Sequence, residues 1–265
     1  MSHRAGFEVA GRVAIRRGSP INDVDAAVRK ALNRTLRGEL NPGEKYWTES
    51  IEALRKKMLS EDTPVTYTDY GSGNGRASEL QQVTKTLRSV VSYSVPRHEG
   101  LVLFNLVRTL RPAQCLELGT CVGISAAYIA AAIDLNETGR LTTLEGGRDL
   151  ARVASINLTR MKLGNVDLVS GPFEQRLPEV LPKLRPVDFA YIDGHHEGEA
   201  TQNYFRQIVA QSAQSAVVVL DDIRWSRDMH SAWKTIRSHP AVVASYDLLV
   251  FGVCLVRHAG TRSRA

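Results

Sequence analysis

The stretch Cys115-Leu116-Glu117-Leu118-Gly119-Thr120-Cys121-Val122-Gly123 decides the fold, because it reads as an apolar strand that ends in a glycine turn. Two sites downstream repeat the pattern of an apolar run that ends in acid, Tyr191-Ile192-Asp193-Gly194 and Val219-Leu220-Asp221-Asp222. In an open parallel sheet, ligands bind beyond the carboxyl ends of the strands. Three such strands would therefore direct their functional groups into one crevice.

From Cys115 onward, short apolar runs alternate with helical periods, which predicts a doubly wound α/β sheet. Strands are expected at 114–118, 140–144, 166–169, 187–192 and 216–220. Helices are expected at 124–133, 149–163, 174–181, 199–212 and 229–238. Two last apolar runs, 245–250 and 253–257, flank Phe251-Gly252 and predict a tight antiparallel β-hairpin.

The chain before this sheet is predicted to be helical. Asn22-Asp23-Val24-Asp25 offers N-caps for a first helix, and further helices fit 46–58, 78–92 and 99–109. The glycine-rich segment 70–76 reads as a linker or an active-site lid. A phosphate-binding loop is the alternative, but no strand precedes the segment and no Gly-Lys-Ser/Thr follows it. We expect residues 1–95 to form a helical extension with this lid or linker, and 96–265 to form the core.

Composition narrows the function classes. Of 265 residues, 43% are hydrophobic and 23% charged, and the net charge of +6 comes from dispersed positions. No basic stripe interleaved with aromatics suggests nucleic acid, so none is expected as a partner. Neither an apolar run of about 20 residues nor a secretory signal is visible, which favours a cytoplasmic protein away from membranes. The three cysteines lack metal-site spacing, and we expect free thiols.

The glycine turn suits a small anionic or nucleoside ligand. Gly119 and Gly123 permit a tight bend, and the helix after them begins with free N–H groups that suit a carboxylate or phosphate. Taken alone, the turn could equally be an ordinary strand–helix connection. Glu145 ends the next strand, where a carboxylate can accept both hydroxyls of a ribose. The Gly-x-Gly-x-x-Gly fingerprint of nicotinamide enzymes is missing.

With these residues the chain resembles the class I S-adenosylmethionine-dependent methyltransferases, and most of all the cation-dependent O-methyltransferases of the catechol and caffeoyl-CoA type. The resemblance implies a Rossmann-like, mostly parallel seven-stranded sheet with the hairpin at its end, and S-adenosylmethionine as cofactor. It rests on His98-Glu99-Gly100, Glu117-Leu118-Gly119 with Gly123, Glu145, Gly171-Pro172-Phe173 and Asp221-Asp222-Ile223-Arg224-Trp225. The cofactor-binding residues it implies are Glu99, Gly100, Glu117, Gly119, Thr120, Cys121, Gly123, Ser125, Glu145, Gly146, Gly171, Phe173 and Asp193.

The same resemblance implies a metal site on Asp193, Asp221 and Asp222. Asp222 departs from the asparagine of the family, which keeps an oxygen donor but makes the site more anionic. Three converging carboxylates would repel one another without a cation, and oxygen ligands suit Mg²⁺ or another divalent ion. The alternative is that Asp221 and Asp222 cap the following loop and helix, while Asp193 binds the cofactor amine.

His196 stands where the catechol-type enzymes carry a catalytic lysine, so we expect it to act as base beside Asp193, with an ordinary pKa near 6.5. His195 is expected to bind a metal or cap a helix, Trp225 to lie near the site and Trp233 in the core. The resulting hypothesis is methylation of a small-molecule hydroxyl, with a homodimer as a further expectation. The alternatives are a metal-independent methyltransferase of nitrogen or macromolecules, and a non-catalytic protein that binds an adenosyl ligand.

Overall fold

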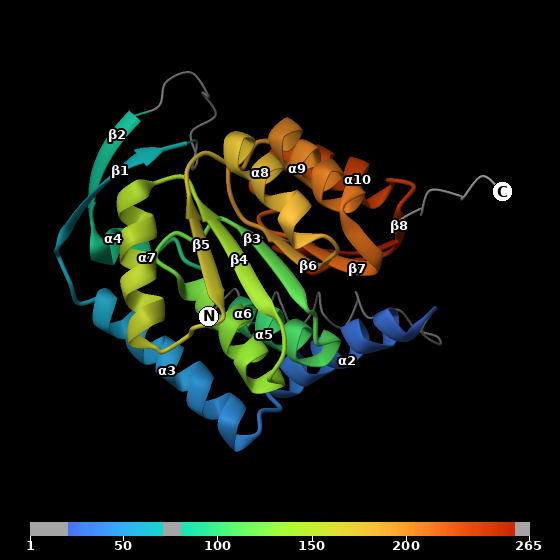
Figure 1. Ribbon diagram of the computed structural model, residues 1–265, viewed down its shortest axis with the longest axis horizontal. Helices are drawn as coiled ribbons and strands as arrows, with labels where there is room; N and C mark the ends of the chain where they lie inside the picture. The colour runs from blue at the N-terminus through green and yellow to red at the C-terminus, as the bar shows by residue number, and fades with distance from the viewer. Residues whose placement is uncertain (1–20, 71–80, 258–265) are drawn as a thin grey trace.

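The structure, a computed structural model, describes residues 21–70 and 81–257. Its centre is a seven-stranded sheet in the order β5-β4-β3-β6-β7-β9-β8 (Figure 1). The strands are β3 (Gln114–Leu118), β4 (Arg140–Glu145), β5 (Val166–Ser170), β6 (Val187–Ile192), β7 (Ser212–Leu220), β8 (Val242–Asp247) and β9 (Gly252–Arg257). The strands β3 to β7 are parallel, and β9 runs antiparallel between β7 and β8. This confirms the predicted fold.

The predicted position of the hairpin turn is wrong in detail. Asp247 pairs with Gly252, so Gly252 begins β9 and the connection is residues 248–251. Phe251 is buried and its ring lies 5.7 Å from that of Tyr191. Burial of this ring against the sheet fixes the connection, which local turn preferences could not reveal.

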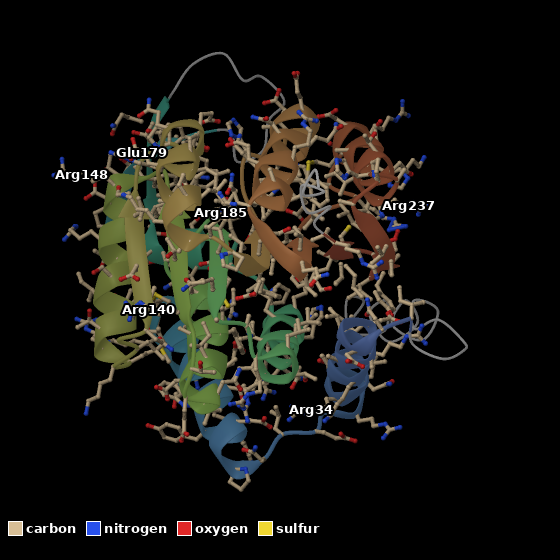
Figure 2. The ribbon with its side chains drawn as sticks, turned by 45° about the vertical axis from the view of Figure 1, so that its right-hand side comes forward. Arg34, Arg140, Arg148, Glu179, Arg185 and Arg237 are labelled. Carbon is tan, nitrogen blue, oxygen red and sulfur yellow. The ribbon has the colours of Figure 1, made fainter. Side chains whose placement is uncertain are left out.

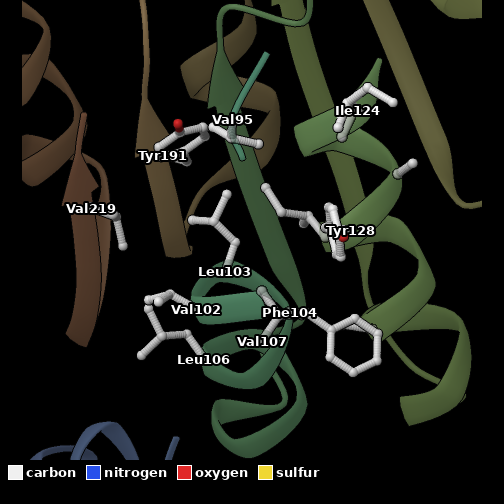
Figure 3. Packing of buried hydrophobic residues seen from close by; sticks show 14 of the residues in the cluster. Val95, Val102, Leu103, Phe104, Leu106, Val107, Ile124, Tyr128, Tyr191 and Val219 are labelled. Atoms are coloured by element: carbon white, nitrogen blue, oxygen red, sulfur yellow. The ribbon is translucent and has the colours of Figure 1, made fainter. Parts of the chain in front are cut away.

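Helices cover both faces of the sheet. One core contains side chains of α5 (Arg97–Leu110), α6 (Ile124–Asn136) and α7 (Arg148–Arg160), and Figure 3 shows α5 and α6 packed against the strands. A second core contains side chains of α8 (Phe173–Leu184), α9 (Gly198–Ala210) and α10 (Arg227–Arg237). Trp233 is buried in the second core, as predicted. The loops between strands and helices are thereby held at one edge of a packed sandwich.

The N-terminal helices pack onto the first core. The helix α2 (Asp23–Arg37) is capped by Asn22, which accepts a hydrogen bond from the Asp25 N–H. The helix α3 (Pro42–Met58) begins four residues earlier than predicted, because Asn41 and Glu44 form a capping box around Pro42. Their buried side chains belong to the same core as α5 and α6, while the boundary at residue 95 stays a prediction.

The predicted helix at 78–92 is wrong over residues 81–86. Residues Gln81–Thr86 form strand β2, which pairs with β1 (Pro64–Asp69), and only α4 (Leu87–Val91) is helical. In β1, Val65 and Tyr67 are buried while Thr66 between them is exposed, which is the alternation of a strand with one covered face. This ribbon lies beside α7 (Figure 1). Of the predicted lid segment 70–76, residues 71–76 lie outside the described residues.

A buried ion cluster ties the N-terminal helices to the core. Glu44 contacts the guanidinium groups of Arg34 at 2.5 Å and Arg108 at 3.0 Å. Burial alone would raise the pKa of Glu44, but hydrogen bonds from Arg34, the Asn41 N–H and Arg108 outweigh it and lower the pKa. We call these three charged side chains the Glu44 cluster. It joins α2, α3 and α5.

Charge on the outside of the molecule is spread over many elements. The arginines labelled in Figure 2 come from α2, β4, α7, α10 and the connection before β6. Within the described ranges, no helix has the length and apolar character needed to cross a lipid bilayer.

Candidate active site at the carboxyl ends of the strands

The ends of β3, β6 and β7 are aligned by the register of the sheet. Leu118 pairs with Ile192, and Ile192 with Leu220, so the residues that follow them emerge at one edge. Gly119 has a φ of +104°, and a Cβ there would lie 1.6 Å from the carbonyl oxygen of Asp193. Only glycine allows this contact between the two loops. The sheet therefore brings the glycine turn and the acids together, as predicted.

Glu117 is a buried acid directly below the glycine turn. The Thr143 hydroxyl donates to its Oε2, and the Thr120 hydroxyl lies 2.5 Å from that of Thr143. Its Oε1 is buried and has no hydrogen-bond partner among the described residues. Burial raises the pKa of Glu117 to about 7; the Thr143 and Ser125 hydroxyls oppose the shift and the charge of Glu145 adds to it. Such an oxygen suits a cationic ligand group.

Glu145 is held by the backbone of the two neighbouring turns. Its Oε2 accepts the Cys121 N–H at 2.7 Å, and its Oε1 accepts the Gly147 N–H at 2.7 Å. Burial raises its pKa to about 7, although these two hydrogen bonds lower it. A carboxylate has about four acceptor positions, so about two stay available for ligand hydroxyls. This fits the predicted ribose contact.

Asp193 and Asp221 share the hydroxyl of Tyr191. This buried phenol donates to Asp221 and lies 3.1 Å from Oδ2 of Asp193. Burial raises the pKa of Asp193, and repulsion by Asp222 raises it further. The pKa of Asp221 is raised by burial and then by the charges of Asp193 and Asp222. The pair is thus electrostatically unfavourable when both carboxyls are ionised.

His196 lies between two of the acids. Its Nδ1 is 3.3 Å from Oδ2 of Asp222, and its Nε2 is 3.9 Å from Oδ1 of Asp193. Burial lowers its pKa, although the charge of Asp222 opposes the shift. Trp225 is 57% exposed, and its ring centroid is 5.9 Å from the imidazole, as expected for a residue near the site. Of the two histidines, this one faces the acids.

His195 points to a different group of residues. Its Nδ1 lies 2.9 Å from the Tyr204 hydroxyl and 3.1 Å from Oε1 of Glu174. Tyr204 in turn donates to Glu174 at 2.5 Å. His195 therefore links its loop to α8 and α9 and does not join the acid cluster.

This edge of the sheet also carries the three aspartates of the predicted metal site. Asp193, Asp221 and Asp222 lie at one edge, yet both oxygens of Asp221 have donors, one the Tyr191 hydroxyl and the other the Asp222 N–H at 2.6 Å. Across residues 21–70 and 81–257, no group of three or more His, Cys, Asp or Glu side chains has the arrangement of a metal centre. The predicted ligand set stays a prediction.

The other predicted cofactor residues surround the same edge. The Phe173 ring covers Gly194, where a Cβ would lie 2.7 Å from its Cε2, and Gly171 adopts a φ of +134° against Arg176. Glu99 is buried, and its charge raises the pKa of Asp221 and Asp222, so it faces the acids. We call Glu99, Glu117, Asp193, Asp221 and Asp222 the strand-end acids.

Gly100, Ser125 and Gly123 have packing roles visible in the structure. A Cβ on Gly100 would lie 2.3 Å from the ring of Tyr128, so glycine there lets α5 approach α6. Ser125 is buried in the first turn of α6. A Cβ on Gly123, which has a φ of +90°, would meet α7 at Ala154. Cys121 also has a positive φ, +48°, in the same turn.

Tyr191 is a site residue that the sequence reasoning missed. Side chains two residues apart in a strand lie on the same face of the sheet. Tyr191 in β6 thus shares a face with Asp193, and the pairing Glu117–Tyr191–Val219 places all three residues in one row. That spacing was the available signal.

Comparison with known proteins agrees with this geometry. Residues 116–223 match the family model described as a methyltransferase domain. The matched segment begins in β3 and ends just past Asp221 and Asp222, so it contains the strand ends described above.

The chain is similar to a catechol O-methyltransferase from Niastella koreensis, with 30% identity over 132 residues, or 49% of this chain. The match spans 58% of the length of that relative. An O-methyltransferase from Bacillus cereus in complex with SAH has a TM-score of 0.59 at 19% identity, over 88% of this chain and 100% of that one. The O-methyltransferase TomG from Streptomyces achromogenes, in complex with SAM and involved in tomaymycin synthesis, has a TM-score of 0.52 at 24% identity, over 62% and 82% of the chains. The structural matches establish the class I methyltransferase fold.

Proposed function

We propose that this chain is an S-adenosylmethionine-dependent O-methyltransferase that acts on a hydroxyl group of a small molecule. The crowding of the strand-end acids beside His196 carries the proposal, because among the described residues no lysine or arginine forms an ion pair with these carboxylates. S-adenosylmethionine supplies an electrophilic methyl group on a positively charged sulfonium. A cationic ligand of this kind offsets the repulsion among the acids.

The residues divide into those that hold the cofactor and those that act on the acceptor. Glu145, fixed by the N–H groups of Cys121 and Gly147, would accept the ribose hydroxyls. The unpartnered Oε1 of Glu117 and the close-packed Gly119 turn suit the cationic amino acid end. Holding both reactants in line would provide much of the acceleration.

His196 is the proposed base. Its lowered pKa leaves the imidazole neutral at pH 7, so it can take the proton of the acceptor hydroxyl. Asp222, at 3.3 Å from Nδ1, fixes the ring and stabilises the imidazolium that results. Asp193, at 3.9 Å from Nε2, lies on the other side of the ring.

Dependence on a divalent cation is the finer part of the proposal. The donor chemistry supports it, because the three aspartates offer hard oxygens that suit Mg²⁺. Asp193, Asp221 and Asp222 are the residues that would hold the ion. When bound, such an ion lowers the pKa of a coordinated hydroxyl.

The name of the Niastella koreensis relative supports a catechol or other phenol as the acceptor class. A panel of catechols, simple phenols and sugars, assayed with S-adenosylmethionine with and without EDTA, tests acceptor class and cation dependence together. Turnover of catechols that stops in EDTA and returns with Mg²⁺ is expected. Turnover unaffected by EDTA would contradict the proposed dependence on a cation. SAH binding without turnover on any acceptor would favour the non-catalytic alternative.

The role of His196 has its own test. His196→Gln should lower kcat by roughly 10²- to 10⁴-fold, the usual contribution of a general base, while the SAH dissociation constant stays within about twofold. His195→Gln is the matched control, since His195 faces Tyr204 and Glu174. Equal losses in the two variants would contradict the assignment.

A further inference from the structure

Two tyrosines of the N-terminal ribbon cover the turn that follows Glu145. A Cβ on Gly146 would lie 2.7 Å from Cδ2 of Tyr70, and a Cβ on Gly147 would lie 3.3 Å from Cβ of Tyr67. The Tyr70 ring thus occupies the space that a side chain at position 146 would fill. Tyr67 and Tyr70 come from a part of the chain that lies some 75 residues before this turn and outside the matched domain, residues 116–223.

This turn is where the nucleoside end of the cofactor belongs. Glu145 directly precedes it, and its carboxylate is oriented by N–H groups of Cys121 and Gly147. The charge of Asp69, next to Tyr70, raises the pKa of His196, so this end of β1 faces the strand ends. The end of β1 therefore borders the same edge of the sheet as the acids.

The two tyrosines differ in how much of their surface the protein covers. Tyr67 is 7% exposed and belongs to the first core, which anchors the ribbon to α7. Tyr70 is only half-buried, so part of its ring stays uncovered beside Gly146. Aromatic planes of this kind stack readily on nucleobases.

We propose that Tyr70 is a cofactor-binding residue whose ring forms an apolar wall of the nucleoside pocket, in the place left open by glycine at position 146. The proposal rests on the proposed function and extends it, because it makes the N-terminal ribbon part of the cofactor site. Tyr70 and Tyr67 of this ribbon lie against Gly146 and Gly147, in the turn that follows Glu145.

Calorimetric titration of the full chain with SAH and with 5′-methylthioadenosine tests the proposal. Tyr70→Ala should weaken both ligands by roughly tenfold or more, as expected for loss of a stacking aromatic, because both contain the adenosine half. Tyr70→Phe should stay within about twofold. Tyr46→Ala, at a tyrosine 66% exposed on α3, is the matched control and should change neither affinity.

A second variant separates a binding role from anchoring of the ribbon. Gly146→Met in the Tyr70→Ala background places an apolar side chain in the emptied space and should recover at least part of the lost affinity. Restored binding supports the proposal, whereas a melting temperature lowered in Tyr70→Ala with SAH affinity unchanged overturns it. Wild-type protein that binds neither ligand overturns the proposed function as well, so the two failures are distinguishable.

Discussion

The Glu44 cluster and the strand-end acids both bury carboxylates, but they solve the electrostatic problem differently. Glu44 lies against two guanidinium groups, and its pKa is lowered. Glu117, Asp193 and Asp221 are crowded by other acids and by a phenol, and their pKa values are raised. A buried acid that is paired with arginines contributes to the stability of the fold. Buried acids without such partners favour the binding of a cationic ligand.

The same substitution should therefore have opposite effects in the two regions. Glu44→Gln should destabilise the protein at pH 7 by about 3–5 kcal/mol, because it leaves Arg34 and Arg108 without the charge that pairs them. Since the pKa of Glu44 is lowered, the loss should shrink as pH falls below its ordinary value of 4.5. Denaturant unfolding at several pH values measures it. Glu39→Gln, at an exposed pair with Arg37, is the control.

Glu117→Gln should be stabilising at alkaline pH. Folded Glu117 keeps its proton up to about pH 7, while the unfolded chain loses it near 4.5, so the stability of the wild type falls as pH rises through this window. The variant should exceed the wild type by roughly 3 kcal/mol at pH 8 and nearly match it at pH 4.5. It should also bind S-adenosylmethionine more weakly. A variant less stable than wild type at pH 8 would show that Glu117 has a cationic partner.

The smallest effect separates charge from helix capping within the Glu44 cluster. Asn41 accepts the Glu44 N–H at 2.9 Å, and its own N–H donates to Glu44. Asn41→Ala removes only the side-chain cap and should cost about 1 kcal/mol in unfolding free energy. A cost as large as that of Glu44→Gln would mean that the cap, and not the paired charges, holds α3 in place.

The fold from β3 onward could be predicted because each strand carries two signals, an apolar run and a glycine or acid where the run ends. The ribbon β1–β2 carried weaker ones. In the six-residue strand β1, only Val65 and Tyr67 alternate with exposed residues, and the residues of β2 are mostly polar. Thr66 of β1 pairs with Thr84 of β2, and a pairing between two separate segments cannot be read from local periodicity.

The residues of the candidate site could be predicted from the sequence, but the contacts between their side chains could not. Glycines and acids at strand ends identified Gly119, Glu145 and Asp193 from the sequence. Their partners depended on packing: Tyr191 between two aspartates, and His195 turned toward Tyr204. His195 and His196 both have a positive φ, +70° and +38°, and this backbone geometry decides which of the two faces the acids. No local sequence pattern predicts it.

The Tyr246 hydroxyl in β8 donates a hydrogen bond to Asp25 and accepts one from Arg29. These hydrogen bonds join α2 to the C-terminal hairpin β8–β9. Tyr246 follows Asp25 by 221 positions in the sequence and Arg29 by 217. At about 5–20 residues per second on the ribosome, roughly ten to forty-five seconds separate their synthesis. During that interval α2 carries a carboxylate and a guanidinium whose shared partner has not been made. The polar contact between α2 and β8 can therefore form only after synthesis has passed Tyr246.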